Sequence, residues 1–270
     1  MASHLNALTT LVFLLVFIAS GMRLCVCTNF TIINDCKETI WPGITPNSNF
    51  SGGGFTLKPG QSAGGVAGYG VERVVTFNNN GNGTCQTGGC GGSIKCTGLG
   101  APPASIAEFS LGQLDFYDVS LVDGFNLPVV VTPINGKGNC SVAGCDQDLR
   151  STCPSELAAK SDGKTIACRS ACNVFNTDEY CCRGMYSNPV TCVPTNYSST
   201  FKASCPTAYS YAYDDPTSIL TCSTSDYVVT FCGSRNRTEC SYHDQKLVCS
   251  SNGLKAQPHV ADMLYREVKD

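Results

Sequence analysis

Four carboxylates lie within sixteen residues of one strand-like stretch and are the residues best placed to do chemistry. They are Glu108, Asp115, Asp118 and Asp123. Carboxyl groups can transfer protons or accept hydrogen bonds from ligand hydroxyls. In an extended chain, Asp118 and Asp123 point to opposite faces. Because Asp123-Gly124 favours a turn, the chain can bend there and bring both acids into one cleft. We expect an acidic patch near a strand end; alternatively, these acids cap turns or pair with Arg and Lys.

The composition predicts a mainly β protein held together by disulfides. The 270 residues include 27 Gly and 19 Cys, and only 14% are charged, which is typical of a loop-rich, cross-linked chain. Short segments rich in Val, Thr, Phe and Tyr alternate with Gly, Pro and Asn, which favours strands. A net charge of -3 and a pI near 5.6 provide no basic surface, so we expect no nucleic-acid partner.

Residues 1–27 are predicted to be a signal peptide. Their apolar core, Leu11 to Ala19, is too short for a comfortable membrane span, and no transmembrane segment is expected. The cysteine content independently requires an oxidising compartment. Sequons for N-glycosylation, compatible with secretion, occur at Asn29, Asn49, Asn82, Asn139, Asn196 and Asn236.

Two long motifs resemble the signatures of the thaumatin-like proteins, the plant pathogenesis-related group that includes osmotin. They are GNGTCQTGGCGGSIKC at Gly81 to Cys96 and DFYDVSLVDGFNLP at Asp115 to Pro128. The resemblance extends over residues 28–233 and implies a β-sandwich, a disulfide-rich loop and helix lobe (about 146–206) and a small stapled hairpin lobe (about 75–104). It also implies a secreted monomer of the apoplast or vacuole. Residues 234–270 form an additional polar tail.

The family resemblance also implies a disulfide pairing. The implied bonds are Cys36–Cys232, Cys90–Cys96, Cys140–Cys222, Cys145–Cys205, Cys153–Cys168, Cys172–Cys181 and Cys182–Cys192. Cys85 loses its usual partner, because Val75 stands where relatives carry a cysteine. In the tail, Cys240 and Cys249 are expected to pair with each other; alternatively, Cys85 joins one of them.

A metal site is not expected, and neither is a cofactor. Zinc sites use spaced CxxC pairs or histidines, whereas this chain crowds its cysteines between Cys140 and Cys205 and has only three histidines. One helix is expected in this cysteine-rich part, either at Ser155 to Ser161 or at Ala167 to Phe175.

The resemblance further implies a cleft between the sandwich and the disulfide-rich lobe, lined by one arginine and four acids. Motif matching places the acids at Glu108, Asp118, Asp123 and Asp214, with Asp215 as the alternative to Asp214, and the arginine at Arg73, one position from the counted Glu72. Aromatic residues expected to flank the cleft are Phe116, Phe125 and Tyr213.

An acidic, aromatic cleft suits sugar hydroxyls and the apolar faces of sugar rings. The first hypothesis is therefore a secreted, antifungal plant defence protein that binds cell-wall β-1,3-glucan. The alternative is an endo-β-1,3-glucanase with candidate catalytic residues Glu108, Asp118 and Asp123, which would need two carboxyl groups about 5 Å or about 6.5–9.5 Å apart. A third possibility is an inhibitor of digestive enzymes, which would use the outer surface.

Overall fold

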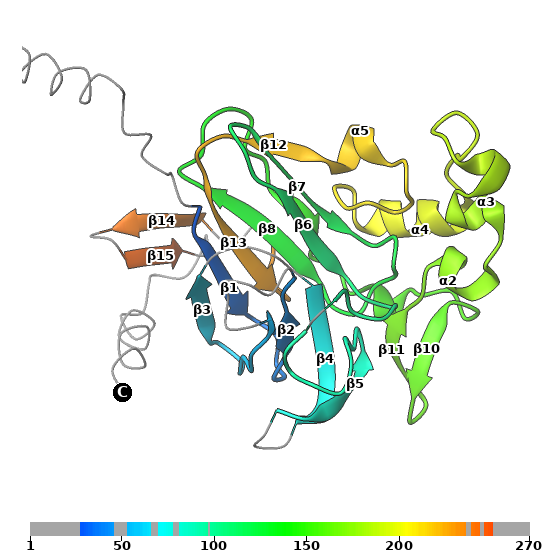
Figure 1. Ribbon diagram of the computed structural model, residues 1–270, viewed down its shortest axis with the longest axis horizontal. Coiled ribbons are helices and arrows are strands. Elements are labelled where there is room, and N and C mark those ends of the chain that lie inside the picture. The colour runs from blue at the N-terminus through cyan, green and yellow to red at the C-terminus, as the bar shows by residue number, and fades with distance from the viewer. Residues whose placement is uncertain are drawn as a thin grey trace, which may run out of the picture.

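The computed structural model describes residues 28–45, 53–65, 70–77, 81–96, 98–235, 239–243 and 246–250. Within residues 65–77 and 239–250 it describes the backbone only. The predicted signal peptide lies outside the described residues. The fold is mainly β, as the composition predicted (Figure 1).

A five-stranded sheet forms one layer of the sandwich. Its order is β3 (Ser62–Gly65), β1 (Phe30–Asn34), β13 (Asp226–Phe231), β8 (Val129–Ile134) and β9 (Ala143–Cys145). β1 and β13 run parallel, and the other neighbours are antiparallel. The central strands are rich in Val, Ile, Thr and Phe, whose branched and aromatic side chains favour a pleated, buried surface.

A three-stranded sheet forms the second layer, in the order β12 (Leu220–Cys222), β7 (Asp115–Ser120) and β6 (Ile106–Ser110). Aromatic rings join the two layers: Phe109 of β6 contacts Phe30 and Tyr227, and Tyr117 of β7 contacts Tyr227 at 5.1 Å between ring centroids. Because alternate side chains point to opposite faces, Phe116 and Asp118 lie on the face of this sheet that is turned away from the core.

A third sheet contains β2 (Trp41–Gly43), β4 (Gly70–Phe77) and β5 (Gly83–Thr87). Its β4 and β5 strands pair irregularly, with register shifts on both sides of Val74, and Val74 lies opposite Cys85. The strand register therefore places Val74 across from Cys85, and Val75, where the family resemblance led us to expect a cysteine, is the next residue in the chain.

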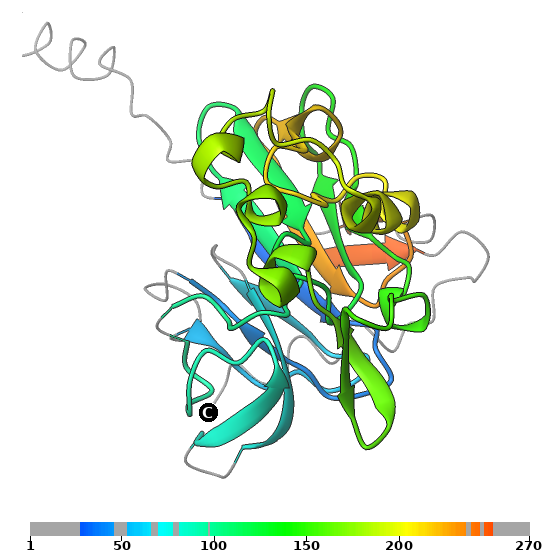
Figure 2. The same cartoon turned by 90° about the vertical axis from the view of Figure 1, so that its right-hand side faces the viewer.

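Residues 149–205 form the disulfide-rich lobe, whose helices lie in front of the sheets in Figure 2. Its elements are η2 (Leu149–Ser151), β10 (Ala158–Ser161), β11 (Lys164–Cys168), α2 (Ala171–Phe175), α3 (Asp178–Cys181), η3 (Gly184–Tyr186) and α4 (Asn196–Ser204). Ser170, Thr177 and Thr195 cap α2, α3 and α4 through side-chain hydrogen bonds to the first turn.

One of the two expected helix positions is wrong. Residues 158–161 are the strand β10, which pairs with β11 through the two-residue turn Asp162-Gly163. Both turn residues have positive φ, 51° and 74°, as an Asp-Gly hairpin turn requires. The other expected range, Ala167 to Phe175, contains α2 in its second half.

Within the described residues, seven disulfides have the pairing that the family resemblance implied. They are Cys36–Cys232, Cys90–Cys96, Cys140–Cys222, Cys145–Cys205, Cys153–Cys168, Cys172–Cys181 and Cys182–Cys192. Three of them lie inside the disulfide-rich lobe and hold its short helices and hairpin in place. This number of bonds is typical of a secreted protein.

The tail contains a hairpin of β14 (Glu239–His243) and β15 (Lys246–Ser250). Cys240 lies opposite Cys249 in its register, but the side chains needed to test their predicted pairing are outside the described residues. In the part of the chain that the structure describes, no helix has the length and apolar character needed to cross a bilayer. Four sequons, at Asn29, Asn82, Asn139 and Asn196, have exposed asparagines, and those at Asn49 and Asn236 lie outside the described residues.

Candidate functional site

Glu108 and Asp118 face each other across neighbouring strands. Their Cα atoms are partners in the register of β6 and β7, and both side chains lie on the face of the three-stranded sheet that is turned away from the core. Residues directly opposite in an antiparallel pair have Cβ atoms only about 5 Å apart, so the two carboxyl groups come within hydrogen-bonding reach. The motif that predicted an acidic patch therefore produces a carboxyl pair.

The surroundings of Asp118 favour its protonated form at neutral pH. Burial, the charge of Glu108, the hydrogen bond to Glu108 and the charge of Asp215 together raise the pKa of Asp118 to about 8. Partial burial and the charge of Asp123 raise the pKa of Glu108, while the hydrogen bond from Asp118 counteracts them. Asp118 is only 8% exposed, and its Oδ1 atom has no hydrogen-bond partner among the described residues.

Asp215 is the third acid near the pair, and the segment before it sets its position. Tyr209 pairs with the end of β7, because its N–H donates to the carbonyl of Val119 and its carbonyl accepts from Leu121. Its hydroxyl donates to Asp215 Oδ1 at 3.1 Å. This anchored tyrosine holds Asp215, the first residue of α5 (Asp215–Ser218), where its charge acts on Asp118.

Asp123 reaches the acidic surface through a turn, as its sequence predicted. The Gly124 N–H donates to the Leu121 carbonyl at 2.9 Å, and Gly124 has φ +92°. A Cβ atom at this glycine would lie 2.8 Å from the Cys168 carbonyl oxygen, so the close approach to β11 requires glycine. Burial raises the pKa of Asp123, and its charge raises that of Glu108.

A pocket of about 80 Å³ lies between this turn and the disulfide-rich lobe. Val122, Asp123 and the segment 210–212 form its sandwich side. Its lobe side is contributed by residues of α2, α3 and α4, including Tyr180 and Tyr197. Among the acids that the family resemblance implied for a cleft, Asp123 lines this pocket.

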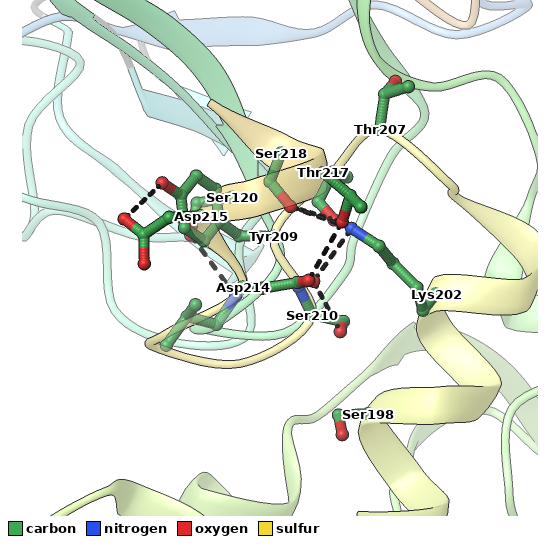
Figure 3. A network of polar contacts seen from close by, with 12 residues as sticks. Ser120, Ser198, Lys202, Thr207, Tyr209, Ser210, Asp214, Asp215, Thr217 and Ser218 are labelled. Carbon is green, nitrogen blue, oxygen red and sulfur yellow. Dashed lines mark hydrogen bonds and ion pairs between the residues drawn. The ribbon is translucent and has the colours of Figure 1, made fainter. Parts of the chain in front are cut away.

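Asp214 has a different environment from the other acids (Figure 3). Its carboxylate forms an ion pair with Lys202 Nζ at 2.9 Å and accepts hydrogen bonds from the Ser210 N–H, the Ser210 hydroxyl and the Thr217 hydroxyl. Burial by itself would raise its pKa, but Lys202 and the Ser210 donors hold the pKa of Asp214 below its ordinary value. Asp214 therefore ties α4 to the segment before α5.

Among the predicted aromatic residues, Phe116 and Phe125 have opposite exposure. Phe116 is 42% exposed and lies on the same face as Asp118, opposite Thr221 of β12. Phe125 is 0% exposed and pairs through its backbone with Cys168, so its assignment to the cleft is wrong. It belongs to the core because the turn at Gly124 reverses the direction of the chain. Tyr213 is half-buried.

The predicted arginine is located through its backbone only. Arg73 pairs with Thr87 in the β4–β5 ladder, and Glu72 pairs with Trp41; their side chains lie outside the described residues. Among the residues that the structure describes, no group of three His, Cys, Asp or Glu side chains is arranged to hold a metal ion.

Sequence reasoning did not find Tyr209 or Lys202. Tyr209 lies within YSYAYDD, a tyrosine-rich run whose individual roles cannot be distinguished without the pairing to β7. Lys202 is the basic residue in the last turn of α4, a position that is more often explained by the helix dipole than by a buried ion pair.

Comparison with known proteins identifies the family. The sequence profile of the Thaumatin family matches residues 34–233. The chain is 50% identical over 217 residues to pathogenesis-related thaumatin-like protein 3.5 of Cryptomeria japonica, covering 77% of this chain and 90% of that protein. It is 47% identical over 229 residues to pathogenesis-related protein 5 of Arabidopsis thaliana, covering 81% and 95%.

Among solved structures, the thaumatin-like xylanase inhibitor TLXI aligns with 76% of this chain and 99% of its own, at 23% identity and a TM-score of 0.39. The matched profile covers most of the described chain and includes both motifs on which the resemblance was based. The chain belongs to the thaumatin family.

Proposed function

We propose that this protein is a secreted plant defence protein that binds β-1,3-glucan of fungal cell walls through the open face of its three-stranded sheet. One observation carries the proposal: the cross-strand carboxyl pair of Glu108 and Asp118 lies beside the exposed ring of Phe116. The defence role is supported by the relatives, which are named pathogenesis-related proteins.

The chemistry of this face suits a neutral sugar. Phe116 offers an aromatic surface for the apolar face of a pyranose ring. The exposed carboxyl group of Glu108 accepts hydrogen bonds from sugar hydroxyls, and the buried Asp118 lies beside it as its cross-strand partner. A sugar brings hydroxyl donors without adding charge, which fits a site whose own charges are already close together.

Binding is favoured over hydrolysis by the placement of the carboxyl groups. The two carboxyl groups of a glycosidase flank the scissile bond, with about 5–5.5 Å between them in a retaining enzyme and about 6.5–9.5 Å in an inverting one. Glu108 and Asp118 are direct cross-strand partners on one face of the sheet, so they approach a ligand from the same side. An endo-β-1,3-glucanase would therefore have to pair Glu108 with Asp123, whose charge acts on Glu108.

The test is co-sedimentation with insoluble β-1,3-glucan, together with a reducing-end assay on soluble laminarin. Loss of one hydrogen bond to a charged group costs about 1.5–3 kcal/mol, so Glu108→Gln is expected to weaken retention at least about tenfold. Asp162→Asn is the matched control, because it changes an acid in the β10–β11 turn, where Asn also tolerates positive φ.

Retention of Glu108→Gln and Phe116→Ala at the wild-type level would overturn the proposal. Formation of reducing ends by the wild type, abolished in Glu108→Gln and in Asp123→Asn, would replace binding with hydrolysis as the function of the site.

A further inference from the structure

The pocket beside Asp123 continues across the disulfide-rich lobe into a second hollow. Glu156, Pro194 and Asn196 line only this second hollow, on the side away from Asp123. Both hollows are lined by Glu179, Tyr180, Val193, Thr195 and Tyr197. The two hollows are therefore adjacent, and α3 and the start of α4 contribute to both; the surface that they form together, from Asp123 to Glu156, is called the tyrosine groove below.

Two tyrosine rings line this groove on the lobe, and Phe175, which lines neither hollow, packs against both of them. Tyr180 and Tyr197 meet edge to face with ring centroids 5.7 Å apart, and Phe175 contacts both, at 5.3 and 5.4 Å. Phe175 is 38% exposed. Aromatic rings at a protein surface, held by neighbouring rings, provide flat apolar contact area at little cost in side-chain entropy.

Carboxylates accompany these rings. The Tyr197 hydroxyl donates to Glu156 Oε1 at 2.8 Å, and the Ser155 hydroxyl donates to Glu156 Oε2 at 3.1 Å. These bonds fix the carboxylate above the tyrosine, and each oxygen has a second lone pair for a ligand hydroxyl. Glu179, the residue before Tyr180, is exposed and lines both hollows. The lobe therefore repeats the combination of ring and carboxylate that Phe116 and Glu108 provide on the sheet.

Disulfides keep this wall in one arrangement. Cys172–Cys181 ties α2 to α3, and Cys182–Cys192 ties the residue after α3 to the segment that leads into Val193. The capping box of Thr195 and Ser198 fixes the start of α4, which carries Tyr197. A surface that is already ordered loses little entropy when it binds a ligand.

We propose that the tyrosine groove of the disulfide-rich lobe is a second binding surface for the same glucan chain, occupied by sugar units beyond those that contact the acidic face. This inference rests on the proposed function. It makes the affinity depend on glucan length. A short oligosaccharide contacts the acidic face only, whereas a longer chain also contacts Tyr180, Tyr197 and Glu156. Contacts made by one chain at two surfaces increase its affinity without any change at the first surface.

Isothermal titration with laminaritriose and with laminarin tests this inference. In Tyr180→Ala and Tyr197→Ala we expect laminarin to bind about fivefold to tenfold more weakly, as the loss of one stacked ring predicts, and laminaritriose to bind as in the wild type. Tyr197→Phe keeps the ring and is expected to retain most of the laminarin affinity. Tyr186→Ala, in the same lobe but outside both hollows, is the control, and near-ultraviolet circular dichroism verifies the fold.

The outcomes separate the two proposals. Laminarin affinity unchanged in both alanine variants, with binding still sensitive to Glu108→Gln, would overturn the second surface and leave the acidic site intact. An equal loss for laminaritriose and laminarin would show that the tyrosines act through the acidic face, which also overturns it. A wild type that binds neither ligand would overturn the proposed function and, with it, this inference.

Discussion

Asp118 and Asp214 are two aspartates of equal burial with opposite electrostatic environments. Each is 8% exposed. Asp214 is ionised, paired with Lys202 and hydrogen-bonded by Ser210 and Thr217. Asp118 faces another acid, has a pKa raised to about 8, and carries an oxygen with no hydrogen-bond partner among the described side chains and backbone groups.

The comparison separates an acid whose carboxylate oxygens are paired within the protein from one that keeps an unpaired oxygen among the described residues. Burial does not distinguish them, and neither does their position in a family motif. What distinguishes them is whether the protein itself supplies the partners of the carboxyl oxygens, since a buried polar group that lacks them costs free energy. The protein completes the site of Asp214 and leaves that of Asp118 incomplete.

The largest effect on stability is expected from removing Lys202, the cation that pairs with Asp214. Lys202→Met leaves the Asp214 carboxylate buried without its counter-charge, which should lower the free energy of unfolding by about 3–5 kcal/mol. Guanidinium denaturation of the disulfide-intact protein measures it, with Lys160→Met on the exposed strand β10 as the control. The double variant Lys202→Met with Asp214→Asn should recover part of the loss. A loss below about 1 kcal/mol would mean that the pair contributes no more than a surface salt bridge.

At Asp118, by contrast, removing the charge is expected to raise the free energy of unfolding. The pKa of Asp118 is raised on folding, so the folded protein binds a proton that the unfolded chain releases, and stability falls as the pH rises from about 4 to about 8. Asp118→Asn imitates the protonated acid and should raise the free energy of unfolding by about 1–3 kcal/mol at pH 7.

This gain should disappear below about pH 3, where Asp118 is protonated in both the folded and the unfolded state. Denaturation curves of Asp118→Asn and of the wild type at a series of pH values provide the measurement. Parallel pH profiles of the two proteins would show that Asp118 is already ionised at neutral pH and that the contrast with Asp214 is absent.

A smaller effect, on binding alone, is expected at the exposed ring beside the pair. Phe116→Ala should weaken glucan retention by about fivefold to tenfold, because it removes the platform for the sugar ring, while the free energy of unfolding changes by about 0.5 kcal/mol or less. Leu114→Ala, an exposed apolar residue in the β6–β7 turn, is the control in co-sedimentation. A loss of stability equal to that of a core residue would instead assign Phe116 to the packing.

The smallest effect is expected at Asp215. Its charge is one of the causes that raise the pKa of Asp118, so Asp215→Asn should lower that pKa by about 0.5. A carbon-detected NMR titration of the Asp118 carboxyl group measures the change. Asp162→Asn, which removes an acid from the β10–β11 turn, is the control. No change in Asp215→Asn would place this acid outside the site.

The sequence predicted the fold more completely than the site. Long motifs and ordered cysteines identify the fold, because each disulfide joins positions that the family pattern already relates. The acids that surround the carboxyl pair depend on turns instead. Nothing in the dipeptide Asp214-Asp215 indicates that the first side chain binds Lys202 while the second is held by Tyr209.

Phe125 shows that an apolar residue beyond a turn is equally hard to place from the sequence. It follows Asp123 by two residues and would share its face in a continuous strand, but Gly124 reverses the chain and buries the ring completely. Alternation along a strand predicts which face a side chain occupies only as far as the next turn. Glu108 and Asp118 were within that reach, since they lie inside regular strands in register.

The position of β13 in the middle of the five-stranded sheet has a consequence for biosynthesis. β1 emerges early from the ribosome, yet its parallel neighbour and the cysteine that bonds to Cys36 follow 196 residues later. At a translation rate of about 5–20 residues per second, the Cys36 thiol remains without its disulfide partner for roughly 10–40 s. A nascent chain that stops before residue 226 would leave β1 and β8 with open edges, which invite aggregation.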